Sequence, residues 1–142
     1  MLFRSGAFLG LDARHHRAHF ARAGLEGILM ALYSIYEIVG QDSVGQPIRA
    51  TGGYLKSELM LQIQADIFGA PIETPENLEG SIIGAAMVGM KGLGVIRDYS
   101  EVSHFLPIVK VFTPNEQNHQ VYQKSFQKFK WLLYAVQKDQ LG

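Results

Sequence analysis

The sequence contains no cysteine among its 142 residues, which excludes structural disulfides and thiolate-bound metal sites. It also has no excess of either charge, because thirteen lysines and arginines balance thirteen aspartates and glutamates. A chain without a net positive field does not gather nucleic acid or anionic membrane at long range, so neither is expected as a partner. Apolar residues make up 47% of the chain, which is enough for a packed core and excludes global disorder.

Long hydrophobic runs are missing as well. The longest apolar stretch near the middle, Ile82 to Met90, is far too short to span a bilayer. The first five residues, Met1 to Ser5, lack the basic segment and the long apolar run of a signal peptide. We therefore expect a soluble, cytoplasmic protein whose length is that of one domain.

What the sequence does contain is an alternation of short apolar runs and amphipathic segments, which predicts an α/β fold with a short, mostly parallel sheet and flanking helices. The expected strands lie at residues 6–11, 47–51 and 70–74, and residues 92–117 are expected to be mostly loop. Apolar residues at steps of three and four predict helices at about 21–40, 55–69, 80–91 and 118–138. Asp12 is expected to cap the first helix, and Gly69 to end the second.

Glycine and alanine crowd the expected helix at 80–91, where Gly84 and Gly89 are poor helix formers. Their presence predicts close packing of this helix on the sheet. The last helix carries an aromatic stripe that includes Tyr122, Phe126 and Phe129. This stripe favours a core position, and a coiled-coil seam for a partner is the alternative.

The turn from Thr51 to Ser57, Thr-Gly-Gly-Tyr-Leu-Lys-Ser, is the most informative segment. Its two glycines, Gly52 and Gly53, stand between an expected strand and a helix N-terminus, where a ligand can approach the backbone closely. The N–H groups and the dipole of a helix N-terminus attract phosphate, and Ser57 is expected in the first helical turn. Tight turns of this kind also occur without ligands, and this one is neither a P-loop nor a Gly-x-Gly-x-x-Gly motif. The pattern alone therefore does not decide between a nucleotide-binding turn and a turn that binds no ligand.

Other polar residues favour structural roles. His15 and His19, in a cluster with His16, are four residues apart and would share a helix face, as metal ligands can. No acidic residue or further histidine at helical spacing completes a site, and Arg14 and Arg17 would repel a cation, so a solvated first helical turn is favoured over a metal site.

Glu26 lies inside the apolar pattern of the first helix, where pairing with Arg22 four residues earlier is favoured over a buried functional carboxylate. For Asp66, near the end of the second helix, a structural role is likewise favoured over a functional one. No catalytic set of serine, histidine and aspartate and no metal-ligand set is found.

Three linked blocks together resemble the FGGY carbohydrate kinases. Residues 6–11 followed by 19–27 are similar to a family signature, from which Gly24 departs slightly. The next blocks are similar at Ala50-Thr51-Gly52-Gly53, Ser57, Gln62, Ala65-Asp66-Ile67, Gly69-Ala70-Pro71-Ile72, Glu79 and Gly84-Ala85-Ala86. The spacing agrees from about Gly6 to Gly94. The segments 89–94 and 113–115 look most like those of gluconate kinases, and a xylulose or other sugar kinase stays open.

The resemblance implies part of an actin-like ATPase (ribonuclease H-like) domain, with ATP in the cleft between two domains and transfer of its γ-phosphoryl group to a sugar or sugar acid. In the family a carboxylate acts as base and Mg2+ holds the phosphates. Residues 1–142 would be the C-terminal subdomain, and the sugar site, the base and most of the magnesium site would lie in preceding segments. The nucleotide would meet Gly52, Gly53, Tyr54 and Ser57, with Gly53 and Tyr54 acting through their backbone. No catalytic or metal-binding residue of the family is placed in this chain.

We therefore expect the isolated chain to be inactive. The resemblance also implies that the expected strands belong to a larger sheet, whose open edge favours a homodimer. A compact monomer in which the few strands pair among themselves is the alternative. A non-enzymatic association module that retains this subdomain is an open alternative. An unrelated α/β nucleotide binder is disfavoured by the three blocks.

Overall fold

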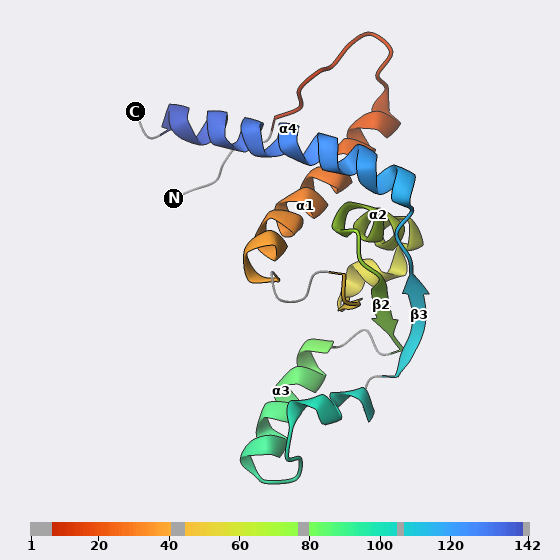
Figure 1. Ribbon diagram of the computed structural model, residues 1–142, viewed down its shortest axis with the longest axis vertical. Helices are drawn as coiled ribbons and strands as arrows, with labels where there is room; N and C mark the ends of the chain where they lie inside the picture. The colour runs from red at the N-terminus through yellow and green to blue at the C-terminus, as the bar shows by residue number, and fades with distance from the viewer. Residues whose placement is uncertain (1–6, 41–44, 77–79, 105–106, 141–142) are drawn as a thin grey trace.

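The computed structural model describes residues 7–40, 45–76, 80–104 and 107–140 (Figure 1). The elements follow the order α1 (Arg17–Val39), β1 (Ile48–Arg49), the 3-10 helix η2 (Gly53–Lys56), α2 (Glu58–Phe68), β2 (Ile72–Pro75), α3 (Gly80–Gly92), the 3-10 helix η3 (Tyr99–His104), β3 (Ile108–Phe112) and α4 (Glu116–Gln140). The four expected α-helices are thereby confirmed. In the part of the chain that the structure describes, no helix is long and apolar enough to cross a membrane.

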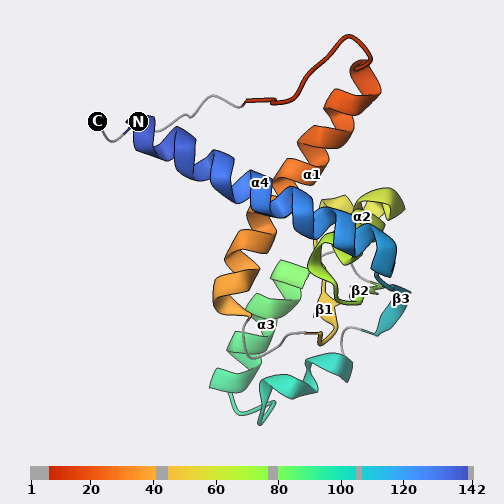
Figure 2. The ribbon, with the colours of Figure 1, turned by 45° about the horizontal axis from the view of Figure 1, so that its top comes forward.

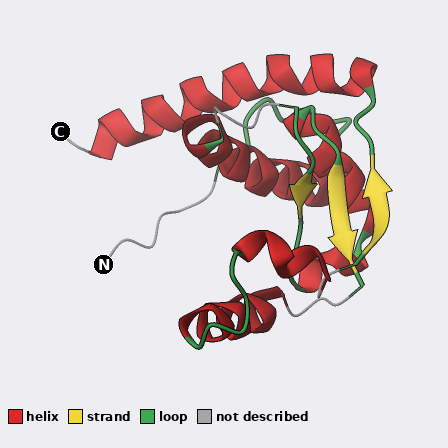
Figure 3. Cartoon of the chain, turned by 60° about the horizontal axis from the view of Figure 1, so that its bottom comes forward, coloured by secondary structure: helices red, strands yellow, loops and turns green. Residues whose placement is uncertain are grey.

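The three strands form one sheet in the order β1-β2-β3 (Figure 3). β1 and β2 are parallel, with Ile48 opposite Ile72, as expected for a strand–helix–strand unit. β3 was not expected, since it lies in the segment interpreted as loop, and it pairs antiparallel with β2, with Phe112 opposite Ile72. The sheet is therefore mixed, with one parallel and one antiparallel pairing.

The N-terminal segment differs from the expectation. Residues 7–11, interpreted as the first strand, form no strand, and residue 6 lies outside the described residues. Asp12 does not cap α1, because its Oδ1 accepts a hydrogen bond from the N–H of Arg14 at 2.9 Å and so closes a turn before the helix. The N-cap is His16, whose N–H donates to Nδ1 of His19 at 3.2 Å.

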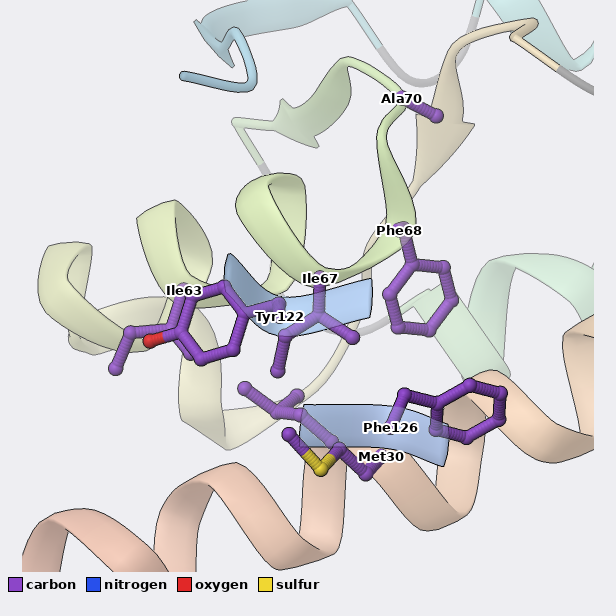
Figure 4. Close-up of a cluster of buried hydrophobic side chains, with 8 residues drawn as sticks. Met30, Ile63, Ile67, Phe68, Ala70, Tyr122 and Phe126 are labelled. Atoms are coloured by element: carbon purple, nitrogen blue, oxygen red, sulfur yellow. The ribbon is translucent and has the colours of Figure 1, made fainter. Parts of the chain in front are cut away.

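One core cluster joins α1, α2 and α4 (Figure 4). Its buried members are Leu29, Met30, Ile63, Ile67, Phe68, Ala70, Tyr122 and Phe126. The first half of the aromatic stripe on α4 thus lies in the core, as favoured by the sequence. Further along the same helix, Leu133 is 42% exposed and Trp131 is 68% exposed. The stripe therefore leaves the core as α4 extends beyond α1.

A second cluster lies between α2 and the sheet. Its buried members are Ala50, Leu55, Leu61, Ala65, Ile72 and Phe112. Because α2 contributes to both clusters, every residue from Ile63 to Phe68 is buried, the polar Gln64 and Asp66 included. α2 is consequently the central element of the fold, and Gly69 ends it in the left-handed conformation expected for a C-terminal glycine.

α3 and η3 lie at the end of the molecule away from α4 (Figures 1 and 2). They pack on each other, and Met87 and Ile96 are buried in this part of the chain. A Cβ added to Gly84 or Gly89 would meet nothing within 4 Å. The prediction that these glycines allow close packing on the sheet is therefore wrong for the described residues, because the glycine-containing face of α3 is open.

Candidate functional site

The candidate site is the turn that leaves β1 and leads into α2. Ala50 is 3% exposed, and its N–H donates to the carbonyl oxygen of Glu73 at 2.9 Å, which anchors the start of the turn to β2. Gly52 then adopts φ +105°, a conformation that other residues rarely adopt. Its carbonyl oxygen accepts from the N–H of Leu55 at 3.2 Å, so the chain enters η2 at once. The expected glycine turn is present, and its second glycine, Gly53, begins the 3-10 helix that leads into α2.

The two glycines of the turn face open space. A Cβ built on Gly52 or on Gly53 would meet no atom within 4 Å, and Gly53 is exposed. At these two positions glycine is therefore not required by packing inside the described part of the chain. Gly52 serves the backbone conformation, and both residues leave the peptide accessible to a ligand from outside.

Tyr54 points its side chain into the fold. Its hydroxyl donates to Oε1 of Gln64 on α2 at 3.1 Å, and the ring packs against the cluster between α2 and the sheet. Burial raises the pKa of Tyr54, and the hydrogen bond to Gln64 opposes that shift in part. Because the ring packs against α2, a ligand would meet Tyr54 through its backbone, whose carbonyl oxygen already accepts from the N–H of Ser57 at 3.0 Å.

Ser57 is the N-cap of α2 and not a residue of its first turn, as the sequence analysis placed it. Its Oγ accepts a hydrogen bond from the N–H of Met60 at 3.4 Å, and its carbonyl oxygen accepts from Leu61 at 3.1 Å. Because the hydroxyl is used as an acceptor, its O–H is the group that can donate to a ligand. Gly52, Gly53, Tyr54 and Ser57 therefore lie along one short turn, and the structure gives each of them a definite local role.

A contact that sequence reasoning missed lies beside this turn. A Cβ on Gly80, the first residue of α3, would stand 2.5 Å from Cγ2 of Thr51. α3 thus begins directly against the side chain of the residue before the two glycines. No local pattern in the sequence indicates this approach, because the two residues are far apart along the chain.

Glu26 and Arg22 form the pair that their spacing predicts, with Arg22 Nε 2.5 Å from Oε1 of Glu26. The structure adds Tyr122 of α4, whose hydroxyl accepts from Arg22 at 2.7 Å and donates to Glu26 at 2.8 Å. Burial is the main cause that raises the pKa of Tyr122. The three side chains join α1 to α4 and lie away from the glycine turn, which gives them a structural role.

Asp66 is likewise structural. Its carboxylate accepts hydrogen bonds from Gln62 of α2 and from the backbone of Asn115 and the side chain of Asn118 at the start of α4. The buried carboxylate therefore fixes the N-terminus of α4 against α2, where its negative charge also complements the helix dipole.

The histidines lie outside the candidate site. His15 precedes α1, so it does not share a helix face with His19 as the spacing suggested, although their rings are 5.4 Å apart. The expectation that His15 has no acidic partner is wrong, because its Nδ1 lies 3.1 Å from Oδ1 of Asp12. All three histidines, His16 included, are exposed, as favoured by the sequence. Among the described residues, no three His, Asp or Glu side chains group closely enough to hold a metal ion.

An apolar groove of about 1110 Å³ lies on another face of the molecule, between the segment before α1, α1 itself and α4. Its lining includes Phe8, Ile28, Met30, Phe129 and Trp131. The groove is larger than a typical ligand pocket, its lining is mainly apolar, and the carboxylate of Glu26 in it is already bonded to Arg22 and Tyr122. We therefore assign the candidate site to the glycine turn and not to this groove.

Comparison with known proteins assigns the chain to a family. The model of the FGGY family of carbohydrate kinases, C-terminal domain, matches residues 2–93. A xylulose kinase of Staphylococcus epidermidis is 37% identical over 123 residues, which cover 85% of this chain and 25% of that protein. A gluconokinase of Bacillus licheniformis is 32% identical over 136 residues, which cover 94% of this chain and 26% of that protein.

Solved structures agree with these matches. The ligand-bound xylulose kinase and the gluconate kinase of Lactobacillus acidophilus each superpose with a TM-score of 0.81 at 33% identity, over 94% of this chain and 27% of theirs. The chain thus spans about a quarter of the length of these relatives. Its mixed sheet and helices form part of the actin-like ATPase fold of the sugar kinases. This chain belongs to the FGGY family of carbohydrate kinases, and it matches the C-terminal domain of that family.

Proposed function

We propose that this chain carries the nucleotide-contacting turn of an ATP-dependent carbohydrate kinase. The observation that carries the proposal is the turn at Gly52 and Gly53, which has a positive φ at Gly52, opens to the outside and lies within the residues that the family model matches. In the proposed complex, Gly53 and Tyr54 meet the nucleotide through their backbone. The hydroxyl of Ser57 stands by the purine and the ribose.

The residues of the turn fit a nucleotide better than they fit a metal ion. An open backbone with glycines accepts a flat base or a phosphate closely, whereas a magnesium ion at a nucleotide site is held by one or two carboxylates together with waters and the phosphates. The turn from Thr51 to Ser57 contains no carboxylate. We therefore assign this chain the task of holding ATP or ADP. The Mg2+, the catalytic base and the sugar site are assigned to the rest of the kinase.

For the intact enzyme we propose the transfer of the γ-phosphoryl group of ATP to gluconate, giving ADP and 6-phosphogluconate. In this proposal residues 1–142 act as a C-terminal subdomain of a cytoplasmic enzyme, and a preceding domain binds the sugar acid. Gluconate is supported by the segments 89–94 and 113–115, and by the gluconokinase relatives. Xylulose is the second candidate, since a xylulose kinase shares 37% of aligned residues with this chain.

Titration with ADP tests the nucleotide site. Half of a cleft leaves the ligand exposed, so we expect a Kd in the millimolar range, about −4 kcal/mol. The amides of Gly52, Gly53 and Ser57 should shift first in NMR spectra. Gly53→Trp should abolish these shifts by filling the open space, whereas Gly89→Trp, which places an indole on the open face of α3, should leave them. Shifts centred on His15 and His19 would contradict the proposed site.

A coupled assay of ADP release tests whether the catalytic base and the magnesium site lie outside this chain. The isolated chain with magnesium-ATP and either gluconate or xylulose should show no turnover, because a positioned base and metal supply many powers of ten in rate. Turnover above background that disappears in Gly53→Trp would overturn the assignment of the chemistry to the rest of the kinase. The same assay on an intact enzyme that contains this sequence decides between the two substrates.

We also propose that the isolated chain forms a homodimer. β3 is an edge strand on which Val109 is 61% exposed, and unpaired strand edges accept further strands. The formal net charge of zero does not oppose association, and it gives no attraction for nucleic acid or membrane. The unpaired edge of β3, with the exposed Val109, also favours a second candidate function, that of an association module without catalysis. Light scattering at several concentrations tests the dimer, and a mass that stays near 15.8 kDa would contradict it.

A further inference from the structure

The contact between Gly80 and Thr51 joins two parts of the molecule that are separate in the sequence. A Cβ on Gly80 would lie 2.5 Å from Cγ2, 2.7 Å from Cβ and 3.2 Å from Oγ1 of Thr51. The first two distances are shorter than real Cβ atoms essentially ever show. Any residue other than glycine at position 80 therefore forces Thr51, the start of α3, or both to move.

The glycine turn is anchored to α2 and the sheet on the side that faces the core. Leu55 is buried in the cluster between α2 and the sheet, Tyr54 is bonded to Gln64, and Ala50 is bonded to Glu73. Among the described residues, these anchors all lie on the side of the turn that faces the fold. The contact with Gly80 comes from another element, α3, which otherwise packs on η3.

Thr51 stands directly before Gly52, whose φ of +105° sets the direction of the turn. A displacement of the Thr51 side chain is transmitted through one peptide to Gly52 and Gly53, which have no side chains of their own to resist it. We therefore expect the position of α3 and the position of the glycine turn to be coupled through the close approach of Gly80 to Thr51.

We propose that Gly80 is a positioning residue for the glycine turn, in that its missing side chain lets α3 begin against Thr51 and so sets where Gly52 and Gly53 stand. The part of this proposal that concerns nucleotide binding rests on the function proposed above. The coupling between α3 and the turn does not rest on it, and the free chain tests it separately.

The experiment is a double-mutant cycle in the full chain. Gly80→Ala adds the clashing Cβ, and Thr51→Gly removes the three atoms nearest to it, which all belong to the side chain of Thr51. Gly84→Ala is the matched control, because it makes the same change one helical turn further along α3, where a Cβ meets nothing within 4 Å. The first readout is the pair of amide signals of Gly52 and Gly53 in the free chain.

We expect Gly80→Ala to move both amide signals further than it moves any amide of α4. The same substitution made in the Thr51→Gly background should leave them in place, as should Gly84→Ala in the natural background. If Gly80 only stabilised α3, Gly80→Ala would change the melting temperature, and the Thr51→Gly background would not restore the amide signals. Unmoved signals of Gly52 and Gly53 in Gly80→Ala, or equal movement in both backgrounds, would overturn the proposal.

The second readout is the Kd for ADP. Gly80→Ala should raise it by about twofold or more, the lower end of the coupling measured between residues in contact, and Thr51→Gly should suppress this effect. If ADP does not bind the natural chain but the amide signals follow the cycle, the function proposed for the turn fails and the positioning role of Gly80 stands. If ADP binds and the cycle shows no coupling in either readout, the positioning role fails alone.

Discussion

Replacing Asp66 with asparagine tests whether one buried carboxylate fixes α4 onto α2. Asp66 is 3% exposed. Its Oδ1 accepts from Nε2 of Gln62 at 2.9 Å and from the N–H of Asn115 at 2.8 Å, and its Oδ2 accepts from Nδ2 of Asn118 at 2.9 Å. Asparagine has nearly the same shape, but one of its two terminal groups is a donor. Either orientation of the amide therefore places a donor against at least one of these three donors.

The size of the effect follows from those bonds. A buried polar group left without a partner costs about 1–3 kcal/mol, and a hydrogen bond to a charged group contributes about 1.5–3 kcal/mol. We expect Asp66→Asn to lower the free energy of unfolding by about 2–3 kcal/mol. At about 2.1 cal/mol/K per residue, the 142 residues have an unfolding entropy of about 0.3 kcal/mol/K, so the Tm should fall by about 7–10 °C.

Thermal unfolding followed by circular dichroism measures this loss, and hydrogen exchange locates it. The amides at the start of α4 should exchange faster in Asp66→Asn. Asp98→Asn is the control, because Asp98 is an exposed carboxylate that also accepts from a backbone N–H, that of Ser100 at 2.8 Å. Its effect should stay within about 0.5 kcal/mol. An equally small effect of Asp66→Asn would refute the reasoning that this carboxylate fixes α4.

Two further predictions concern backbone conformation and pH. Gly69 has φ +63°, and a Cβ there would stand 2.5 Å from the ring of His119, so Gly69→Ala should lower the free energy of unfolding by more than about 1 kcal/mol. Gly24→Ala, within α1 and with no atom within 4 Å of the added Cβ, should instead raise it by about 0.5–1 kcal/mol, and thermal melts measure both. Burial raises the pKa of Tyr122 above its unfolded value of about 10, so its stabilising contribution is complete below that pH and is lost as the pH rises through the folded pKa. Urea unfolding at alkaline pH should show this decline, and a stability that does not fall there would contradict it.

The helices could be predicted from the sequence because their signals are local. Apolar residues four apart define α2, and the predicted end of this helix at Gly69 agrees with the structure, where Gly69 is the C-cap. The pairing of Arg22 with Glu26 follows from their positions one helical turn apart, and the structure has it. The glycine turn was predicted for the same reason, since a strand, two glycines and a helix start are contiguous. Only its detail differs, in that Ser57 is the N-cap of α2.

The strands were harder because their signals are not local. Residues 7–11 form an apolar run that suits a buried strand, but a strand exists only where it finds a partner to pair with. β3, at Ile108–Phe112, lies between Pro107 and Pro114, which read as loop breakers. It is a strand because β2 offers its free edge, and Thr74 donates to the carbonyl oxygen of Lys110 at 3.2 Å. The contact of Gly80 with Thr51 was missed for the same reason, since no local spacing encodes it.

The position of the glycine turn depends on the burial of α2. Leu61 and Ala65 of α2 pack toward the sheet, while Ile63 and Ile67 pack against α1 and α4, so the helix is held on opposite faces. A helix fixed in this way carries its N-terminus, capped by Ser57, at a set place relative to the sheet. The turn before it is free of side chains, and in the part of the chain that the structure describes it is open to the outside. A rigid support below an open backbone is the arrangement that a binding turn requires, because the ordering cost is met when the chain folds and not when the ligand arrives.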